Sequence, residues 1–419
     1  MREEHYDVVV LGGGCSGVAA ALAASRCGKN TLLAERQGAF GGAATTAWVS
    51  AFCGFYTQGK NPKQVVFGIG EEVLQRMRTY GEDIRYTVSP NTGNASIRFH
   101  PEIVKLVMDD LLRESSVKAR LFTTGIEVKK GQSRLEALIL QDEEETYCVH
   151  ASAYIDATGN GNLLHLAGLE TDWGNADGEV QQASLSCLLQ NIPTREIPMT
   201  ILTDAVCAGR QDLANAALLD KDRGLIVKIP KEDSGYLTMP SADLSGLSGE
   251  EKTETMQMLR RKAYAYWQAL RDHAEGFQAA KLLMTAPEIG IRESRRMRGE
   301  DVIRGRDVLE SRKRSDAVAR GGWPVEMHHP EGLRYEKPRD DDWFDIPMGA
   351  LCSRDMENLF ACGRDISCDS MALASLRVMG TGFATGQAAG VMAALYRPGI
   401  HLHAEEVRKV LKDQDARLL

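Results

Sequence analysis

Residues 6–35 read YDVVVLGGGCSGVAAALAASRCGKNTLLAE and hold the clearest structural pattern of the chain. Residues 6–11 are rich in valine, as expected of a buried strand. Residues 15–27 are rich in alanine and leucine, and Gly28 follows as a C-terminal cap, so this segment predicts a helix. Residues 31–34 are again strand-like. The stretch therefore predicts a β-α-β unit.

The turn between the first strand and the helix carries the spacing G-x-G-x-x-G, at Gly12, Gly14 and Gly17. Glycines permit a tight turn and let the backbone approach a pyrophosphate, whose negative charge a helix N-terminus attracts. Glu35 ends the second strand, where a carboxylate accepts hydrogen bonds from ribose hydroxyls. Together these features predict a dinucleotide site, and at this point both FAD and NAD fit it.

The composition excludes several other classes of function. The 419 residues carry a formal net charge of -8, so no general attraction to nucleic acid or anionic membranes is expected. No apolar run is long enough to cross a bilayer, and no signal peptide is recognisable. The nine cysteines never occur as C-x-x-C, which is typical of reduced thiols. We therefore expect a cytoplasmic protein with no metal site.

The pattern of predicted strands and helices changes twice along the chain. Residues 121–154 predict a strand meander, and residues 183–338 then alternate apolar strands with long helical stretches such as 250–284. After residue 338 the first pattern returns, with a short strand at 358–363 and a Gly/Ala-rich helix at 381–395. A domain that takes its last strand and helix from the far end of the chain would be discontinuous.

Three further segments bear on the cofactor. GAFGGAATT (38–46) is a second small-residue loop directly after Glu35 and Arg36, and YIDATGNG (154–161) ends a strand in a small-residue turn. Near the C-terminus, the strand NLFACGRD (358–365) precedes RVMGTG (377–382), which opens a helix.

With the GGGCSG start and GIRESRRMRGE (290–300), these segments resemble the FAD-dependent oxidoreductases of the glutathione-reductase fold. Within that fold the chain is most similar to the fumarate-reductase-like and "FAD-dependent oxidoreductase" group. The motifs are spread from end to end, so the resemblance covers nearly the whole chain.

The resemblance implies how FAD is held. Asp365 would contact the ribityl or pyrophosphate region, and backbone groups near Ile126 would hold the adenine. The helix that begins near residue 378 would point its N-terminus at flavin N1 and the C2 carbonyl, where negative charge grows on reduction. The residues expected to bind FAD are Gly12, Gly14, Cys15, Ser16, Gly17, Glu35, Arg36, Gly41, Gly42, Ala43, Thr45, Ile126, Ala157, Thr158, Gly159, Gly363, Asp365, Val378, Met379 and Gly382.

The predicted fold class is α/β. A discontinuous, Rossmann-like FAD-binding domain would comprise residues 1–170 and 340–419, with an α+β substrate domain, residues 171–339, inserted into it. A second G-x-G-x-x-G is absent from the sequence, which disfavours a separate NAD(P)H domain. Residues 40–60 contain no histidine, so the covalent His-flavin bond of some relatives is not expected and FAD would be bound noncovalently.

Arginines are the first candidates for the substrate side. Strand alternation in GIRESRR (290–296) would place Arg292, Ser294 and Arg296 on one face and Glu293 and Arg295 on the other. Arg292 would bind a substrate anion or stabilise charge near the flavin, or else belong to an Arg/Glu network at the domain interface. The surrounding basic residues are interspersed with acidic ones, which indicates a mixed solvated surface rather than a nucleic-acid site.

Arg377 and His328 are the other two catalytic candidates. Arg377 directly precedes the helix expected to face the flavin, and would act on substrate or flavin or form a structural pair with Asp365 or Asp369. His328 precedes His329-Pro330 in an expected loop, and would accept a proton from an alcohol or amine as hydride leaves, or else be merely exposed.

The predicted function is FAD-dependent hydride transfer between flavin N5 and a small polar substrate, such as an alcohol, amine, hydroxy acid or sugar-like compound. Two alternatives stay open: a fumarate-reductase-like C=C reductase, and a noncatalytic FAD-binding or FAD-sensing protein. The expected partner is a small-molecule substrate, with no nucleic acid and no membrane span. The external electron acceptor or donor and homo-oligomer formation stay open.

Overall fold

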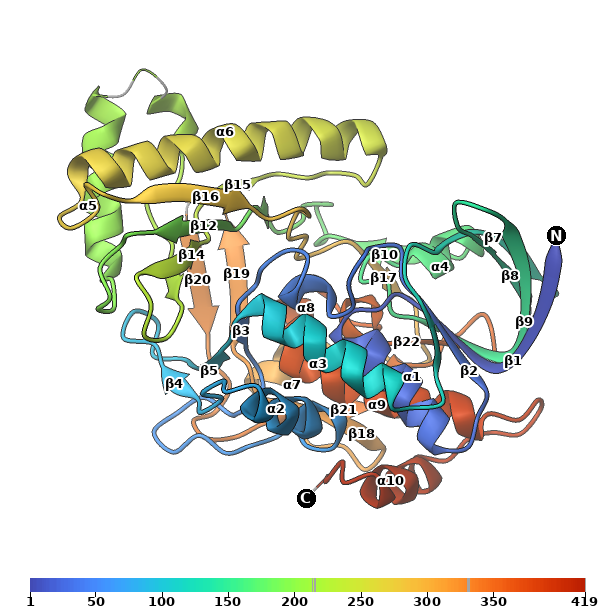
Figure 1. Cartoon of the computed structure of the whole chain (residues 1–419). Coiled ribbons are helices and arrows are strands. Elements are labelled where there is room, and N and C mark those ends of the chain that lie inside the picture. Colours follow the sequence, from blue (N-terminus) through green and yellow to red (C-terminus); the bar gives the residue numbers. More distant parts are fainter. Residues whose placement is uncertain (213, 215, 330–331, 419) are drawn as a thin grey trace.

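The computed structural model describes residues 1–212, 214, 216–329 and 332–418, and Figure 1 shows the whole chain. Its largest sheet has the strand order β6-β2-β1-β9-β8-β7, with β22 also paired to β9. The strands are β1 (Arg2–Leu11), β2 (Thr31–Ala34), β6 (Lys118–Arg120), β7 (Thr124–Lys130), β8 (Leu135–Gln141), β9 (Thr146–Asp156) and β22 (Leu359–Ala361). Among the described residues, no helix combines the length and the apolar composition that a bilayer crossing requires.

The centre of this sheet is parallel. β1 pairs in parallel with β2 and β9, and β2 with β6, whereas β7, β8 and β9 form an antiparallel meander. β9 is shared: its N-terminal half pairs with β8 and its C-terminal residues pair in parallel with β22. The predicted α/β fold with a Rossmann-like parallel core is therefore confirmed.

Alternate residues of β1 point to opposite faces of the sheet. Each face therefore has its own hydrophobic core. Val8 and Val10 join the core formed with the helices, whereas Val9 and Leu11 join a second core with the meander. The helices of this unit are α1 (Cys15–Arg26), α2 (Ile69–Thr79), α3 (Pro101–Arg113), α4 (Asn162–Leu166), α8 (Ser370–Leu376), α9 (Met379–Leu395) and α10 (Ala404–Asp413).

Helices α1 and α9 pack against each other at unusually close range. A Cβ atom added to Gly386 would overlap the carbonyl oxygen of Ser16, and one added to Gly390 would overlap that of Ala20. Only glycine allows the two backbones to approach this closely. This contact joins segments from the two ends of the chain and sets the direction of α9.

A second unit is built on the antiparallel sheet β13-β14-β12-β16, which Figure 1 shows beneath the long helix α6. Its core is separate from that of the first unit and includes Leu189, Leu202, Leu237 and Tyr266. The elements are β11 (Ala183–Ser184), β12 (Cys187–Gln190), α5 (Met199–Asp212), β13 (Ile226–Lys228), β14 (Ser234–Leu237), β15 (Ser241–Ala242), α6 (Gly249–His273) and β16 (Lys281–Thr285).

Short strand pairs complete the fold. The hairpin β19-β20 contributes to the candidate site described below. The remaining elements are β3 (Ala51–Phe52), β4 (Thr87–Val88), β5 (Ala95–Arg98), β10 (Thr171–Trp173), β17 (Arg295–Met297), α7 (Gly305–Leu309), β18 (Ala317–Gly321), β19 (Val325–His329), β20 (Gly332–Glu336) and β21 (Phe344–Pro347).

Two local predictions are wrong. The helical stretch expected over 250–284 ends at His273, and a strand, β16, follows it. Residues 291–294 lie outside the regular strands, so alternation does not hold there. Glu293 and Arg296 consequently face each other in a buried ion pair of 2.8 Å between Oε1 and Nη1 instead of lying on opposite faces.

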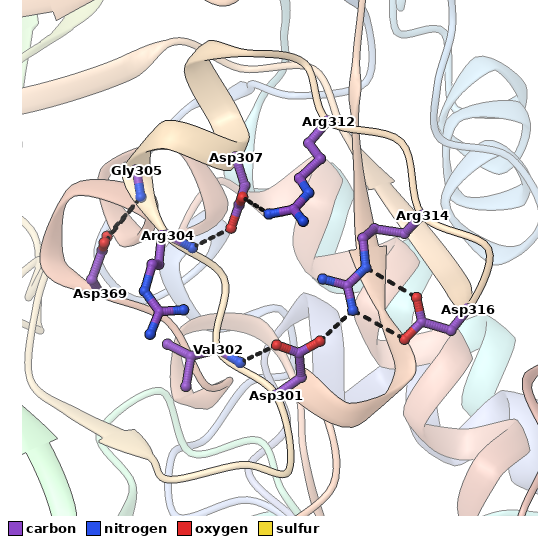
Figure 2. A network of polar contacts seen from close by, with 9 residues as sticks. All are labelled: Asp301, Val302, Arg304, Gly305, Asp307, Arg312, Arg314, Asp316 and Asp369. Atoms are coloured by element: carbon purple, nitrogen blue, oxygen red, sulfur yellow. Dashed lines mark hydrogen bonds and ion pairs between the residues drawn. The ribbon is translucent and has the colours of Figure 1, made fainter.

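Part of the basic run that follows is paired with carboxylates within the protein. Figure 2 shows Arg314 bonded to both Asp301 and Asp316, and Arg312 to Asp307 at 2.7 Å. Asp369 accepts hydrogen bonds of 3.0 Å from the Gly305 backbone amide, which ties the run to the start of α8. This internal pairing agrees with the expectation of a mixed charged surface.

We predict that Gly386→Ala destabilises the protein by about 2 kcal/mol, because the added methyl group meets backbone that cannot move aside. Gly249, in the first turn of α6, is the matched control, since a Cβ there meets nothing within 4 Å. Gly249→Ala should leave stability unchanged or raise it by up to about 1 kcal/mol. Denaturant unfolding of both variants measures the difference, and equal stabilities would refute the close packing.

Candidate functional site

A single large cavity brings the motifs together. It has a volume of about 600 Å³, within the range typical of small-molecule sites, and residues from both units line it. Of the predicted cofactor residues, its wall contains Gly12, Gly14, Cys15, Ser16, Glu35, Arg36, Gly41, Gly42, Ala43, Ala157, Thr158, Gly159, Gly363, Val378, Met379 and Gly382. The predicted catalytic residues Arg292, His328 and Arg377 line the same cavity.

Backbone conformation shapes the end of the cavity where the G-x-G-x-x-G turn lies. Gly12 has φ +104°, and a Cβ there would lie 2.5 Å from the Ala157 carbonyl oxygen, so glycine is required. Gly41 also has φ +104°, and its amide donates to the Gly13 carbonyl at 2.8 Å. The second small-residue loop is thereby held against the first.

Glu35 is buried at the end of β2, and its carboxylate organises the turn. Its Oε2 accepts a hydrogen bond of 2.6 Å from the Gly13 amide, and its Oε1 accepts one of 2.8 Å from the Gln37 amide. Arg36 forms an ion pair with Glu288 at 3.2 Å, which joins the two units beside the cavity.

Four predicted cofactor residues lie outside the cavity wall. Gly17 packs against the Gly12 carbonyl, and Thr45 donates from Oγ1 to the Phe40 carbonyl at 2.8 Å. Ile126 is 40% exposed, and the wall at that end is formed by residues 123–125 instead. Asp365 is fully buried, and its carboxylate accepts from the amides of residues 159 and 161 at 2.7 and 2.9 Å. Gly17, Thr45 and Asp365 support the wall rather than form it, whereas Ile126 lies outside it.

Two helix N-termini open onto the cavity. Gly14 caps α1 and Val378 caps α9, and no side chain of the described residues caps either end. Apart from the Gly380 amide, which donates to the Cys53 carbonyl at 2.9 Å, the first-turn amides are available to an anion or a carbonyl oxygen, and the helix dipole adds positive potential.

The glycines at these two ends provide a test of whether a cofactor fits. At Gly14, which has an ordinary φ of -66°, an added Cβ would approach only Gly42 Cα, at 3.9 Å. At Gly382 an added Cβ would approach only Ser16 Cβ, at 3.8 Å. The protein itself therefore tolerates a side chain at both sites, and a methyl group there would project into the cavity. A ligand that contacts the backbone at these points accounts for both glycines.

His328 lies in β19 rather than in the expected loop; Pro330 falls outside the described residues. Its Nε2 is 2.9 Å from Glu326 Oε1, and its side chain is 12% exposed. Burial, and then the charge of Arg292, lower the pKa of His328 well below its usual value, so the ring is neutral at pH 7. Burial alone would raise the pKa of Glu326, but the hydrogen bond from His328 holds it low.

The charge on Glu326 fixes which nitrogen of His328 carries the proton. A carboxylate only accepts, so Nε2 donates to it and Nδ1 keeps its lone pair. Nδ1 is buried and has no hydrogen-bond partner among the described residues. A neutral imidazole with an unoccupied basic nitrogen thus lines the cavity.

The two arginines are held by backbone carbonyls. Arg292 donates from Nη1 to the Gln182 carbonyl at 2.6 Å, and Arg377 donates from Nη2 to the Glu326 carbonyl at 2.9 Å. The alternative of an Arg377 pair with Asp365 or Asp369 is wrong, because both carboxylates bind backbone amides. The Arg/Glu network exists, but it uses Arg296 and leaves Arg292 on the cavity wall.

Several wall residues were missed from the sequence. Glu326 lies two positions before His328, and on a strand this spacing places both side chains on one face; the expected loop concealed this signal. Trp323, whose Nε1 donates to Glu326 at 2.9 Å, and Tyr335 line the same region. Lys221 also lines the cavity, and no sequence pattern marks it.

The sequence matches the family described as "FAD dependent oxidoreductase" over residues 7–410. The chain therefore belongs to this family, its cofactor is FAD, and it is an enzyme. A search of curated proteins found no match.

Solved structures include distant matches. A geranylgeranyl bacteriochlorophyll reductase-like protein of Thermoplasma acidophilum is 14% identical (TM-score 0.47), with 99% of this chain and 85% of that chain covered. A flavoprotein/dehydrogenase of Cytophaga hutchinsonii is 12% identical (TM-score 0.48; 98% and 83% covered). The p-nitrophenol 4-monooxygenase of Pseudomonas putida is 11% identical (TM-score 0.46; 99% and 84% covered). They carry no argument about the substrate.

We predict that Gly14→Ala weakens FAD binding at least tenfold, since the methyl group would occupy space that the cofactor needs. The melting temperature of the cofactor-free protein should stay the same, because the substitution strains no backbone. Titration of the apoprotein with FAD measures the affinity, and Gly249→Ala serves as the control. Unaltered affinity in Gly14→Ala would exclude this wall as the FAD site.

Proposed function

We propose that this FAD-dependent oxidoreductase dehydrogenates a small polar substrate that carries a hydroxyl or amine, and that His328 is its general base. The supporting observation is the buried, unpartnered Nδ1 of His328, a residue of the wall of the cavity that α9 also faces. Noncovalently bound FAD would be held by the Gly12–Gly17 turn, the 41–43 loop and the N-terminus of α9. When bound, the flavin supplies an acceptor for hydride at N5.

The protein's own groups would control the proton. His328 Nδ1 accepts the proton of the substrate hydroxyl or amine, and the neighbouring carboxylate of Glu326 stabilises the imidazolium that forms. Arg377, at the start of α9, would orient the substrate, since its buried Nε has no partner among the described residues. Burial of the pair limits access of water to the transferred proton.

We also propose the division into an FAD-binding domain, residues 1–170 and 340–419, and a substrate domain, residues 171–339. The pairing of β22 with β9 and the contact of α9 with α1 support the discontinuous part. The separate hydrophobic core around Tyr266 supports the inserted substrate domain. Placement in the glutathione-reductase fold, and a cytoplasmic location, stay predictions.

The direct test is anaerobic. The purified yellow holoenzyme is mixed with pools of alcohols, amines, hydroxy acids and sugars, and absorption of the flavin band is followed. One pool should bleach the band, and air or an artificial acceptor should restore it. Failure of every pool to bleach the band would contradict the proposal.

A second candidate is reduction of an activated C=C bond with an arginine as proton donor. Burial, and then the charge of Arg377, lower the pKa of Arg292 to about 9, which makes its guanidinium a better acid than usual. In this case chemically reduced enzyme is reoxidised by an enoate without oxygen, whereas no alcohol or amine bleaches the oxidised form.

The proton assignment predicts a pH dependence. Because the pKa of His328 lies below 6.5, the base stays unprotonated at neutral pH, and the acid limb of kcat/KM should lie below pH 6.5. His328→Gln should lower kcat by 10²-fold or more, on the order of one general base, and abolish this acid limb while FAD content is retained. An unchanged pH profile in His328→Gln would assign the base elsewhere.

A further inference from the structure

The part of the cavity wall that carries His328 is rich in positive charge: Lys221 is buried, and Arg292 and Arg377 are half-buried. Two other charged pairs on the wall are internally neutralised: Arg98 with Glu196, and Arg36 with Glu288. The wall also carries Glu35, which is bound to backbone amides, Arg364, which donates to the Gly159 carbonyl, and the exposed Arg223. We call the four other charged residues of the wall the substrate-side cluster. Its members are Lys221, Arg292, Glu326 and Arg377.

This cluster has more cations than anions. Glu326 is its one carboxylate, and that carboxylate already accepts from His328 and Trp323. Neither Lys221 nor Arg292 forms an ion pair with any described residue. Buried cations are costly unless an anion compensates them, so the cluster has the charge of a site for an anionic group.

Lys221 is the most unusual member. It is only 7% exposed, although buried lysines are normally paired. Its backbone is fixed by Tyr266, whose hydroxyl accepts from the Lys221 amide and donates to the Lys221 carbonyl, both at 2.8 Å. The adjacent carboxylate, Asp220, is bound to Lys262 at 2.5 Å and so is already engaged.

The surroundings of the Lys221 ammonium group in the cavity also change its pKa. Burial, and then the charge of Arg292, lower its pKa to about 8, so it is largely protonated at pH 7. Lys221 belongs to the second unit, whereas the proposed base is His328. A substrate that contacts both residues would place an anionic group at Lys221 and its reacting hydroxyl or amine at His328.

We infer that Lys221 and Arg292 bind the carboxylate of the substrate, so that the substrate class is a small hydroxy or amino acid rather than a neutral alcohol or sugar. This inference rests on the proposed function, because it concerns the same cavity. It names Lys221 as a specificity-determining residue. Arg292 supplies a planar pair of donors that suits a carboxylate, and Lys221 supplies a second point charge.

The test uses matched carboxylate and amide ligands: glycolate and glycolamide, lactate and lactamide, mandelate and mandelamide. Each is titrated into the oxidised holoenzyme at pH 7, and binding is measured by calorimetry. At least one carboxylate should bind ten or more times more tightly than its amide. Lys221→Met should reduce that ratio below threefold, and Lys221→Arg should largely restore it.

Lys281→Met is the control, because Lys281 is exposed on β16 and does not line the cavity. It should leave the ratio unchanged. Equal binding of carboxylates and amides by the unmodified enzyme, or a ratio that survives in Lys221→Met, would overturn the inference.

A measurement without substitution covers the case in which Lys221→Met does not fold. A pulse of acetic anhydride at pH 8 followed by peptide mass spectrometry should show Lys221 acetylated, with protection by the tightest carboxylate and none by its amide. Equal protection by both overturns the carboxylate site.

The two proposals fail separately. Lys221-dependent carboxylate binding without bleaching of the flavin by any hydroxy or amino acid would refute the dehydrogenase and retain the anionic subsite. Bleaching of the flavin by a neutral alcohol, with carboxylates binding no better than amides, would retain the dehydrogenase and refute the anionic subsite.

Discussion

The close contact of α1 with α9 is the constraint on which the site depends. Gly386 and Gly390 allow these helices to meet backbone to backbone, and both helices begin at the cavity wall. One N-terminus follows the G-x-G-x-x-G turn, and the other follows Arg377. A bulkier residue at the contact would separate two sources of positive potential that a single elongated cofactor has to span.

The second feature that shapes the cavity is the way in which its charged side chains are paired. Carboxylates at the cofactor end are satisfied by backbone amides: Glu35 by residues 13 and 37, and Asp365 by residues 159 and 161. Such carboxylates hold turns in shape and leave little charge for a ligand. On the opposite side cations exceed carboxylates. Under the proposed function, this contrast would distinguish the binding of the dinucleotide from the recognition of the substrate.

Features of the fold and site that depend on neighbouring residues in the sequence could be predicted, whereas features that depend on contacts between distant residues could not. The phosphate turn and Glu35 follow from local spacing, and the parallel core follows from the β-α-β pattern. The positions of Arg292 and Arg296 could not be separated, because alternation applies only within a strand and residues 291–294 are irregular. Lys221 is one of 50 basic residues, and its burial depends on Tyr266 and Lys262, which come from a helix much later in the chain.

The shared strand β9 has a consequence for the order in which the protein assembles. Its C-terminal residues pair with β22, which is made only when the ribosome has reached residues 359–361. The helix that completes the cavity follows still later and ends at Leu395. A nascent chain can therefore fold its first β-α-β unit early, but the long-range contacts that close the site form only after residues 359–395 have left the ribosome. A complete cofactor cavity thus arises only after both distant segments have been made.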